Sequence, residues 1–273
     1  MFGQEFMRNA LLCGTFVALA CAVCGWFLVL RGQMFAGDAL GHVAFPGALA
    51  AAAAGFDERI GLIVATVGAA LAIGVLGRAT AGSRGGAPFA DDTTIGIVFT
   101  FILAVGLFFM TRFTTSTGAT GGVVSARALF GSIFGLGAGE AALAAVVSLL
   151  VVVATLAIAR PLLFSSVAPE AAGARGVRSR TLALGFLALV GVAVAAASQA
   201  VGALLALGLL AAPAGAAHRL TRGPAAGLAV AGAIGLIAMW GGLTLAYVIP
   251  SLPPSSAVIG VAAGVYYLSR IFT

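Results

Sequence analysis

Long apolar stretches repeat along almost the whole sequence, and they constrain the fold more than any other feature. Short segments that carry arginine separate them. Each stretch has about 17 residues or more, close to the roughly 20 that a helix needs to cross the hydrocarbon core of a bilayer. The strands of a membrane β-barrel would alternate apolar and polar side chains, and residues 141–159 show no such alternation. The sequence therefore predicts an all-α protein, a polytopic bundle of transmembrane helices.

Composition supports this fold class. Hydrophobic residues make up 62% of the 273 residues and charged residues only 8%, and the mean hydropathy is +1.16. Globular proteins carry about 25% charged residues. The polar segments are too short for a soluble domain, so residues 1–273 are predicted to form one transmembrane domain. We expect eight or nine spans, near residues 10–30, 37–55, 60–77, 93–111, 138–160, 181–198, 200–217, 225–249 and 254–271.

The basic residues predict an orientation. All are arginine, because the chain contains no lysine. If residues 160–180 face the cytoplasm and nine spans exist, most arginines lie in inner segments. The N-terminus is then outside and the C-terminus inside. The net charge of +6 follows from this topology and requires no nucleic-acid partner. The outer arginines would be Arg8, Arg59, Arg112 and Arg127.

Small residues predict close contacts between the helices. The chain has 39 glycines, and several are four residues apart. This spacing lets helix backbones approach closely in membranes, but it indicates nothing about activity. The pairs are Gly37/Gly41, Gly131/Gly135 and Gly260/Gly264.

One acidic residue differs from the other seven. Asp38 begins the second predicted span, and His42 follows four residues later on the same helix face. A carboxylate and an imidazole together suit zinc, manganese or iron. Two alternatives remain, because Asp38 could cap the helix N-terminus and His42 could hydrogen-bond a neighbouring helix. The remaining acids lie in predicted loops or at helix ends: Glu5, Asp57, Glu58, Asp91, Asp92, Glu140 and Glu170.

Cysteine and the second histidine are weaker candidates for chemistry. Cys21 and Cys24 have the CxxC spacing and share the first span with Cys13. A redox pair normally occupies a helix N-terminus, which lowers the thiol pKa, whereas these lie in mid-span. We expect all three to pack as small apolar side chains. His218 stands beside Arg219 at the end of the seventh span, which favours an interfacial position over a ligand role.

The segment 160–180 is the most informative polar segment. Its pattern is typical of a short helix that starts at Pro169 and stops at Gly176. Such a helix could dock on a cytoplasmic partner. A plain solvated connector has the same pattern, so this alternative stays open.

Four blocks of sequence, taken in chain order, carry a family resemblance. The first is FLVLR at 27–31 with GDALGH at 37–42 and FPG at 45–47. The others are DTTIGI at 92–97, LFGSI at 129–133, and VGALL at 201–205 with APA at 212–214. They resemble the signatures VLRR…GDALSHAxLPG, DTAIGI, LFGSI and VGxLL…PAA of the ABC-3 family, the membrane permeases of bacterial zinc, manganese and iron importers. The similarity spans nearly the whole chain.

The resemblance implies a fold and functional residues. The fold would be that of a type II ABC importer permease, in which Asp38 and His42 coordinate the ion as it crosses. A coupling segment, about 161–180, would contact the ATPase subunit; the family pattern FDPExARAxGV is similar to residues 167–177. Its candidate residues are Pro169, Glu170, Arg175 and Gly176. The chain departs from the family patterns at Gly32 for an arginine, Gly41 for a serine and Ala168 for an aspartate.

The resemblance also implies partners and excludes one activity. A P-loop requires lysine, so this chain is not expected to be an ATPase. The implied partners are a separate ABC ATPase on the cytoplasmic face, an extracytoplasmic metal-binding protein and a second permease copy, in a bacterial cytoplasmic (inner) membrane. No cofactor is expected to stay bound, and the cargo would be Zn²⁺ or Mn²⁺, with a slight preference for zinc on imidazole ligation. Two alternatives are a permease for a metal chelate, of the siderophore or cobalamin type, and an ion-coupled secondary transporter.

Overall fold

The computed structural model describes residues 4–81, 92–117, 133–200, 202 and 206–271. These residues form α-helices and one short 3-10 turn, and the described part of the chain contains no strand, which confirms the all-α class. The helices are α1 (Glu5–Leu30), α2 (Met34–Ala53), α3 (Glu58–Ala81), α4 (Asp92–Thr117), α6 (Ala138–Ala157), α7 (Ala159–Val167), α8 (Pro169–Ala174), α9 (Ser179–Ala200), α10 (Ala206–Leu220), α11 (Pro224–Val248) and α12 (Pro254–Ile271).

Every predicted span coincides with a helix. Six helices, namely α1, α3, α4, α6, α9 and α11, are long and apolar enough to cross a membrane. The other three that match a predicted span fall short by this measure. α10 has only 15 residues. α2 and α12 are long enough, with 20 and 18 residues, but polar side chains such as Asp38, His42 and Arg270 lower their hydropathy. The chain is therefore a multi-pass membrane protein.

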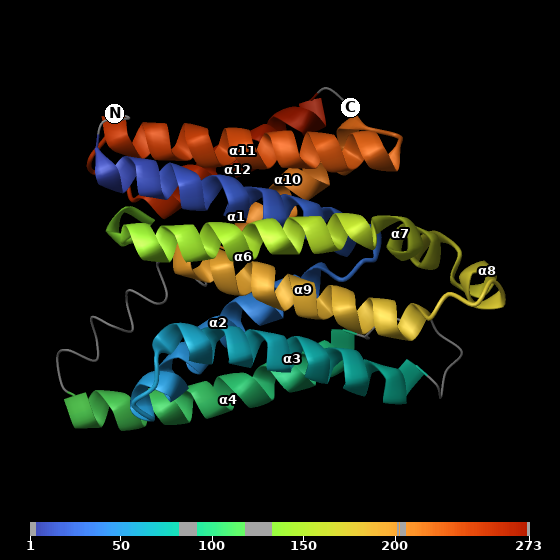
Figure 1. The fold of residues 1–273 in the computed structure, drawn as a ribbon, viewed down its shortest axis with the longest axis horizontal. Helices are drawn as coiled ribbons and strands as arrows, with labels where there is room; N and C mark the ends of the chain where they lie inside the picture. The colour runs from blue at the N-terminus through green and yellow to red at the C-terminus, as the bar shows by residue number, and fades with distance from the viewer. Residues whose placement is uncertain (1–3, 82–91, 118–132, 201, 203–205, 272–273) are drawn as a thin grey trace.

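The helices run along one common direction in a bundle with two distinct ends (Figure 1). The N-terminus lies at one end, and α7 and α8 lie at the other. α1 and α6 pack together and run the same way, so the end of α1 lies toward the end of the bundle that carries α7, and α2 runs back from there. α2 packs against α3 and α4, whereas α10, α11 and α12 group beside α1.

Glycines allow some helices to touch backbone to backbone. A Cβ on Gly47 of α2 would lie 2.3 Å from the Cβ of Ala65 and 2.7 Å from the carbonyl oxygen of Gly61, both on α3. The predicted pair Gly260/Gly264 behaves differently, because a Cβ on either glycine would meet nothing within 4 Å. The spacing therefore does not produce a helix contact at this place in α12. Of the other pairs, Gly131 lies outside the described residues.

One predicted boundary is wrong. The span predicted over 138–160 ends at Ala157, and α7 then makes the first part of the predicted 160–180 segment helical. α3 and α4 continue as helix to Ala81 and Thr117, while the parts of them that are apolar enough to cross a membrane, Glu58–Gly77 and Asp92–Phe109, agree with the predicted spans. Backbone hydrogen bonding continues past the apolar stretch, so hydropathy marks where a span ends and not where its helix ends. The blocks at 129–133 and 201–205 lie largely outside the described residues.

Candidate metal site and coupling segment

Asp38 and His42 meet on one face of α2. The Nε2 atom of His42 lies 3.6 Å from Oδ1 of Asp38, and the two side chains are 32% and 33% exposed. Successive turns of an α-helix place residues four apart side by side, as the sequence predicts. The pair is thus neither sealed inside the bundle nor fully solvated, and an ion can reach it.

The spacing of the two donor atoms allows them to share one ion. Zinc lies about 2.1 Å from nitrogen and oxygen ligands. Two donors 3.6 Å apart, each about 2.1 Å from the same ion, subtend an angle of about 120° at it. This value is close to the tetrahedral angle. The pair can therefore chelate one divalent cation after only small side-chain movements.

The two alternatives for this pair are not realised. The residue that caps α2 is Gln33, and no side chain forms the cap, so Asp38 does not act as an N-cap. Among the described residues, His42 makes no hydrogen bond to a neighbouring helix. Its ring instead packs at a tilt against Phe99 of α4, with centroids 5.6 Å apart, and Phe99 also contacts Phe35. Aromatic contacts hold the imidazole, and its ring nitrogens stay available.

Asp38 and His42 alone would not fill the coordination shell of a metal ion. In the part of the chain that the structure describes, no group of three or more histidine, cysteine, aspartate or glutamate side chains could hold a metal. A divalent cation normally takes four or more ligands. Asp38 and His42 would supply two, so an ion bound to them would take its other ligands from outside the described residues.

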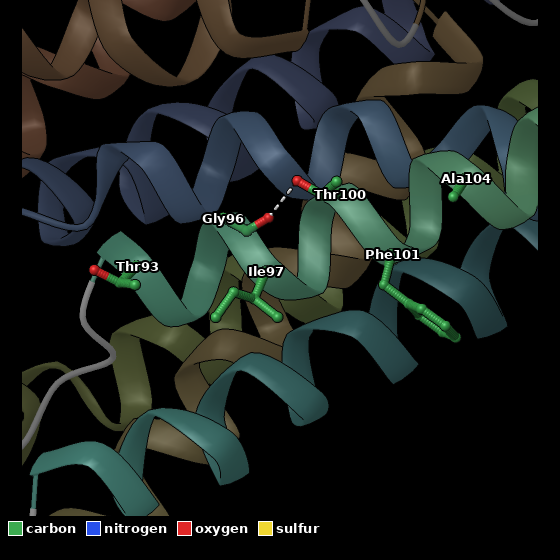
Figure 2. Close-up of a pocket in the computed structure, with 6 residues that line it drawn as sticks. All are labelled: Thr93, Gly96, Ile97, Thr100, Phe101 and Ala104. Atoms are coloured by element: carbon green, nitrogen blue, oxygen red, sulfur yellow. Dashed lines mark hydrogen bonds between the residues drawn. The ribbon is translucent and has the colours of Figure 1, made fainter.

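The face of α4 shown in Figure 2 does not extend the site. It forms an open hollow lined by Thr93, Gly96, Ile97, Thr100, Phe101 and Ala104. None of the lining side chains is charged. The Thr100 hydroxyl donates a hydrogen bond of 2.8 Å to the Gly96 carbonyl in its own helix (Figure 2). This face, which includes part of the DTTIGI block, therefore adds no charged ligand to Asp38 and His42.

The segment after α7 has the predicted helix start and stop. α8 begins with Pro169 at its first position, and Gly176 has a φ of +77°. The amide of Val177 donates to the carbonyl of Ala172, and the amide of Gly176 to that of Gly173, which closes the helix end. Glu170 and Arg175 are exposed. Residues 169–177 therefore form a short, exposed helix whose C-terminal end is closed by two backbone hydrogen bonds.

The other candidates are structural. Cys13, Cys21 and Cys24 are buried and unbridged, which agrees with a packing role. His218 stacks on Trp26 with ring centroids 4.8 Å apart, and its Nε2 lies 2.9 Å from the Trp26 carbonyl oxygen. These contacts join α10 to α1 and leave His218 away from any metal ligand set.

Two interactions were not predicted from sequence. One is the packing of Phe99 on His42, described above. The other is an ion pair between Arg59 of α3 and Glu140 of α6, which also accepts a hydrogen bond from the Gly137 amide. The opposite charges at the starts of two helices are visible in the sequence, but no spacing rule connects residues so far apart.

Arg31, from the FLVLR block, follows the last residue of α1. It is 9% exposed, and its guanidinium carbon lies 5.4 Å from the centre of the Phe186 ring. Burial lowers the pKa of Arg31 to about 10, so it remains charged at neutral pH. A positive charge at this position interacts favourably with the carbonyl end of α1.

Comparison with known proteins identifies the family of this chain. A relative from Haemophilus influenzae, named "Probable iron transport system membrane protein", is 30% identical over 80% of this chain and 76% of its own length. A manganese transport system membrane protein from Halalkalibacterium halodurans is 28% identical over 100% of this chain and 89% of its own length. The solved structure of PsaBC from Streptococcus pneumoniae in complex with a Fab has the same fold, with a TM-score of 0.80, 24% identity and coverage of 97% of this chain and 91% of that one. A family model for the ABC 3 transport family matches residues 3–273. This chain belongs to the ABC 3 transport family.

Proposed function

We propose that this protein is the membrane-spanning permease subunit of an ATP-driven importer for divalent metal ions in a bacterial cytoplasmic membrane, with residues 1–273 as one permease domain. The observation that carries the proposal is the Asp38–His42 pair, with donor atoms 3.6 Å apart and both side chains accessible. The names of the manganese and iron relatives support a metal cargo. Imidazole ligation also suits zinc, so the experiment below compares all three ions.

The two ligands have distinct tasks. Asp38 supplies negative charge, which offsets the cost of moving a dication into a region of low dielectric constant. His42 supplies a neutral nitrogen donor, and Phe99 fixes the orientation of its ring. A second permease copy would bring another Asp38–His42 pair, and water would complete the coordination shell where protein does not. The ion is held briefly and then released, because a conducted ion must leave as readily as it enters.

Two partners besides the second permease copy complete the proposed transporter. A binding protein on the outer face delivers the ion, and a separate subunit hydrolyses ATP, because the chain has no lysine for a P-loop. The ATPase docks on α8 through Pro169, Glu170, Arg175 and Gly176. The exposed, capped geometry of α8 suits rigid coupling to the transmembrane helices, since it lies between α7 and α9 in the chain.

Uptake by the reconstituted transporter tests this function. The permease, its ATPase and its binding protein are placed in vesicles, and ATP-dependent entry of Mn²⁺, Zn²⁺ and Fe²⁺ is measured. Asp38→Asn and His42→Ala should each lower uptake at least tenfold, because each removes half of the protein ligands. Asp57→Asn is the control, because Asp57 is exposed before α3, where its Oδ1 accepts a hydrogen bond from the Arg59 amide.

The outcomes separate the alternatives. Normal uptake by both Asp38→Asn and His42→Ala would show that the proposed site is wrong. Uptake driven by a proton or sodium gradient without the ATPase would instead identify a secondary transporter. Competition by a metal chelate and not by the free ion would identify a chelate permease.

A further inference from the structure

The seam between α10 and α12 ends in a cluster of arginines. α10 and α12 flank α11, and short connections join all three, so α10 and α12 run in the same direction. A Cβ on Gly215 of α10 would lie 3.0 Å from Cε2 of Tyr266 on α12. The guanidinium carbon of Arg219 lies 5.8 Å from the centre of the Tyr266 ring. Tyr266 therefore fills the seam and holds one arginine over its face.

The register brings a second arginine to the same place. Arg219 follows Gly215 by four residues, and Arg270 follows Tyr266 by four residues. Both arginines thus lie one helical turn, about 6 Å, beyond the Gly215–Tyr266 contact and toward the same end of the bundle. Arg222 lies two residues beyond the end of α10, in the connection to α11. Three arginines therefore lie at or just beyond the ends of the parallel helices α10 and α12.

No ion pair within the described residues neutralises the charge of this cluster. Arg219, Arg222 and Arg270 are exposed. No acidic side chain among the described residues forms an ion pair with any of them. The seam can therefore accept an anion without breaking an existing interaction.

The surroundings favour a lipid as the source of that anion. Next to the arginines, Tyr267 is 64% exposed and Ile271 is 76% exposed. Leu220 and Leu268 are also exposed. Tyrosine and arginine at helix ends mark the interfacial zone of a membrane, where headgroups lie above acyl chains. α8 is a separate feature, because Figure 1 shows it well apart from the C-terminus, at the far edge of the protein.

We propose that the end of the α10–α12 seam binds an anionic phospholipid. Arg219 and Arg270 contact the phosphate, Arg222 adds long-range attraction, and the acyl chains lie along Tyr267 and Ile271. Basic pockets between transmembrane helices are known to hold phosphate headgroups in this way. The site does not depend on the metal chemistry of α2.

A binding titration tests the proposal. The full-length permease is purified in a neutral detergent and titrated with fluorescent phosphatidylglycerol, and with phosphatidylcholine that carries the same label. Wild type should bind phosphatidylglycerol more tightly, and high salt should weaken this binding. The double variant R219Q/R270Q should bind phosphatidylglycerol about 30-fold more weakly, from a contribution of about 1 kcal/mol per arginine.

Two further variants make the result specific. R160Q/R178Q removes the same charge near α7 and α8, at two exposed arginines, and should keep wild-type affinity. R219K/R270K keeps the charge and should retain most of the binding, which guards against a folding defect in R219Q/R270Q. Equal loss in R160Q/R178Q and R219Q/R270Q would show a general surface effect and overturn the proposal. Unchanged lipid binding in R219Q/R270Q would also overturn it, as would displacement of the labelled lipid by free glycerol phosphate as effectively as by unlabelled phosphatidylglycerol.

Discussion

The contact between α2 and α3 should be unusually sensitive to a single added methyl group. In Gly47→Ala, the new Cβ would lie 2.3 Å from the Cβ of Ala65 and 2.7 Å from the Gly61 carbonyl oxygen. Real Cβ atoms essentially never approach other heavy atoms within 3.0 Å. Neither neighbour can rotate away, because one is a methyl group fixed to a helix and the other belongs to the backbone. The two helices must therefore separate.

The cost can be estimated from related overpacking changes. Extra methyl groups in a tightly packed core destabilise by about 1–3 kcal/mol. Replacing glycine by alanine within a helix gains up to about 1 kcal/mol from helix propensity, which opposes this cost. Gly260→Ala is the matched control, because its Cβ meets nothing within 4 Å and only the propensity gain remains. The difference between Gly47→Ala and Gly260→Ala isolates the packing term.

Unfolding of the purified protein in mixed detergent micelles measures this difference. Gly47→Ala should unfold at a lower denaturant concentration than wild type, and Gly260→Ala at the same or a higher one. Gly61→Ala should behave like Gly47→Ala, because its Cβ would lie 2.4 Å from the Gly47 carbonyl oxygen. Equal stability of Gly47→Ala and Gly260→Ala would refute the close approach of α2 and α3.

Three further changes test the site and its supports. Phe99→Ala should weaken metal uptake several-fold by freeing the His42 ring, whereas Phe99→Tyr should not; transport assays measure both. Removing Arg59 and Glu140 singly and together should give a coupling energy of about 0.2–1 kcal/mol that salt weakens, measured by unfolding. Gly176→Ala should reduce ATPase binding, because a side chain with positive φ costs about 1–2 kcal/mol, and Gly176→Asn should retain more binding.

Much of the helical arrangement follows from simple rules of length and polarity. Apolar stretches of sufficient length must form helices in a bilayer, because their backbone groups have no other partners there. The break at Ile158 can also be explained from the sequence, because Pro161 has no backbone N–H to donate to the Ala157 carbonyl and its ring crowds that turn. Glycine spacing is a weaker guide, since Gly260 and Gly264 meet no neighbour among the described residues and close approach depends on which helix lies opposite. Gly47 meets Gly61 through tertiary packing that one sequence does not reveal.

The candidate metal site was also predictable only in part, because one sequence does not reveal contacts between helices. Asp38 and His42 are four residues apart, so helix geometry alone brings them together. Phe99 comes from another helix and is one of 18 phenylalanines, so nothing in the sequence selects it as the partner of His42. Local periodicity predicts contacts within a helix, and contacts between helices depend on the whole bundle.

The small number of ligands on α2 is better suited to conduction than to storage. Structural zinc sites with full ligand sets bind with about 14 kcal/mol, which corresponds to a Kd of about 10⁻¹⁰ M. With association at about 10⁹ M⁻¹s⁻¹, such an ion would stay for roughly ten seconds. If two ligands supply about half of that free energy, the Kd is about 10⁻⁵ M and the ion leaves about 10⁴ times per second. Asp38 and His42 lie about 6 and 12 Å along α2 from its first residue. An ion held there by two protein ligands can be released within a transport cycle, whereas a complete cage would trap it.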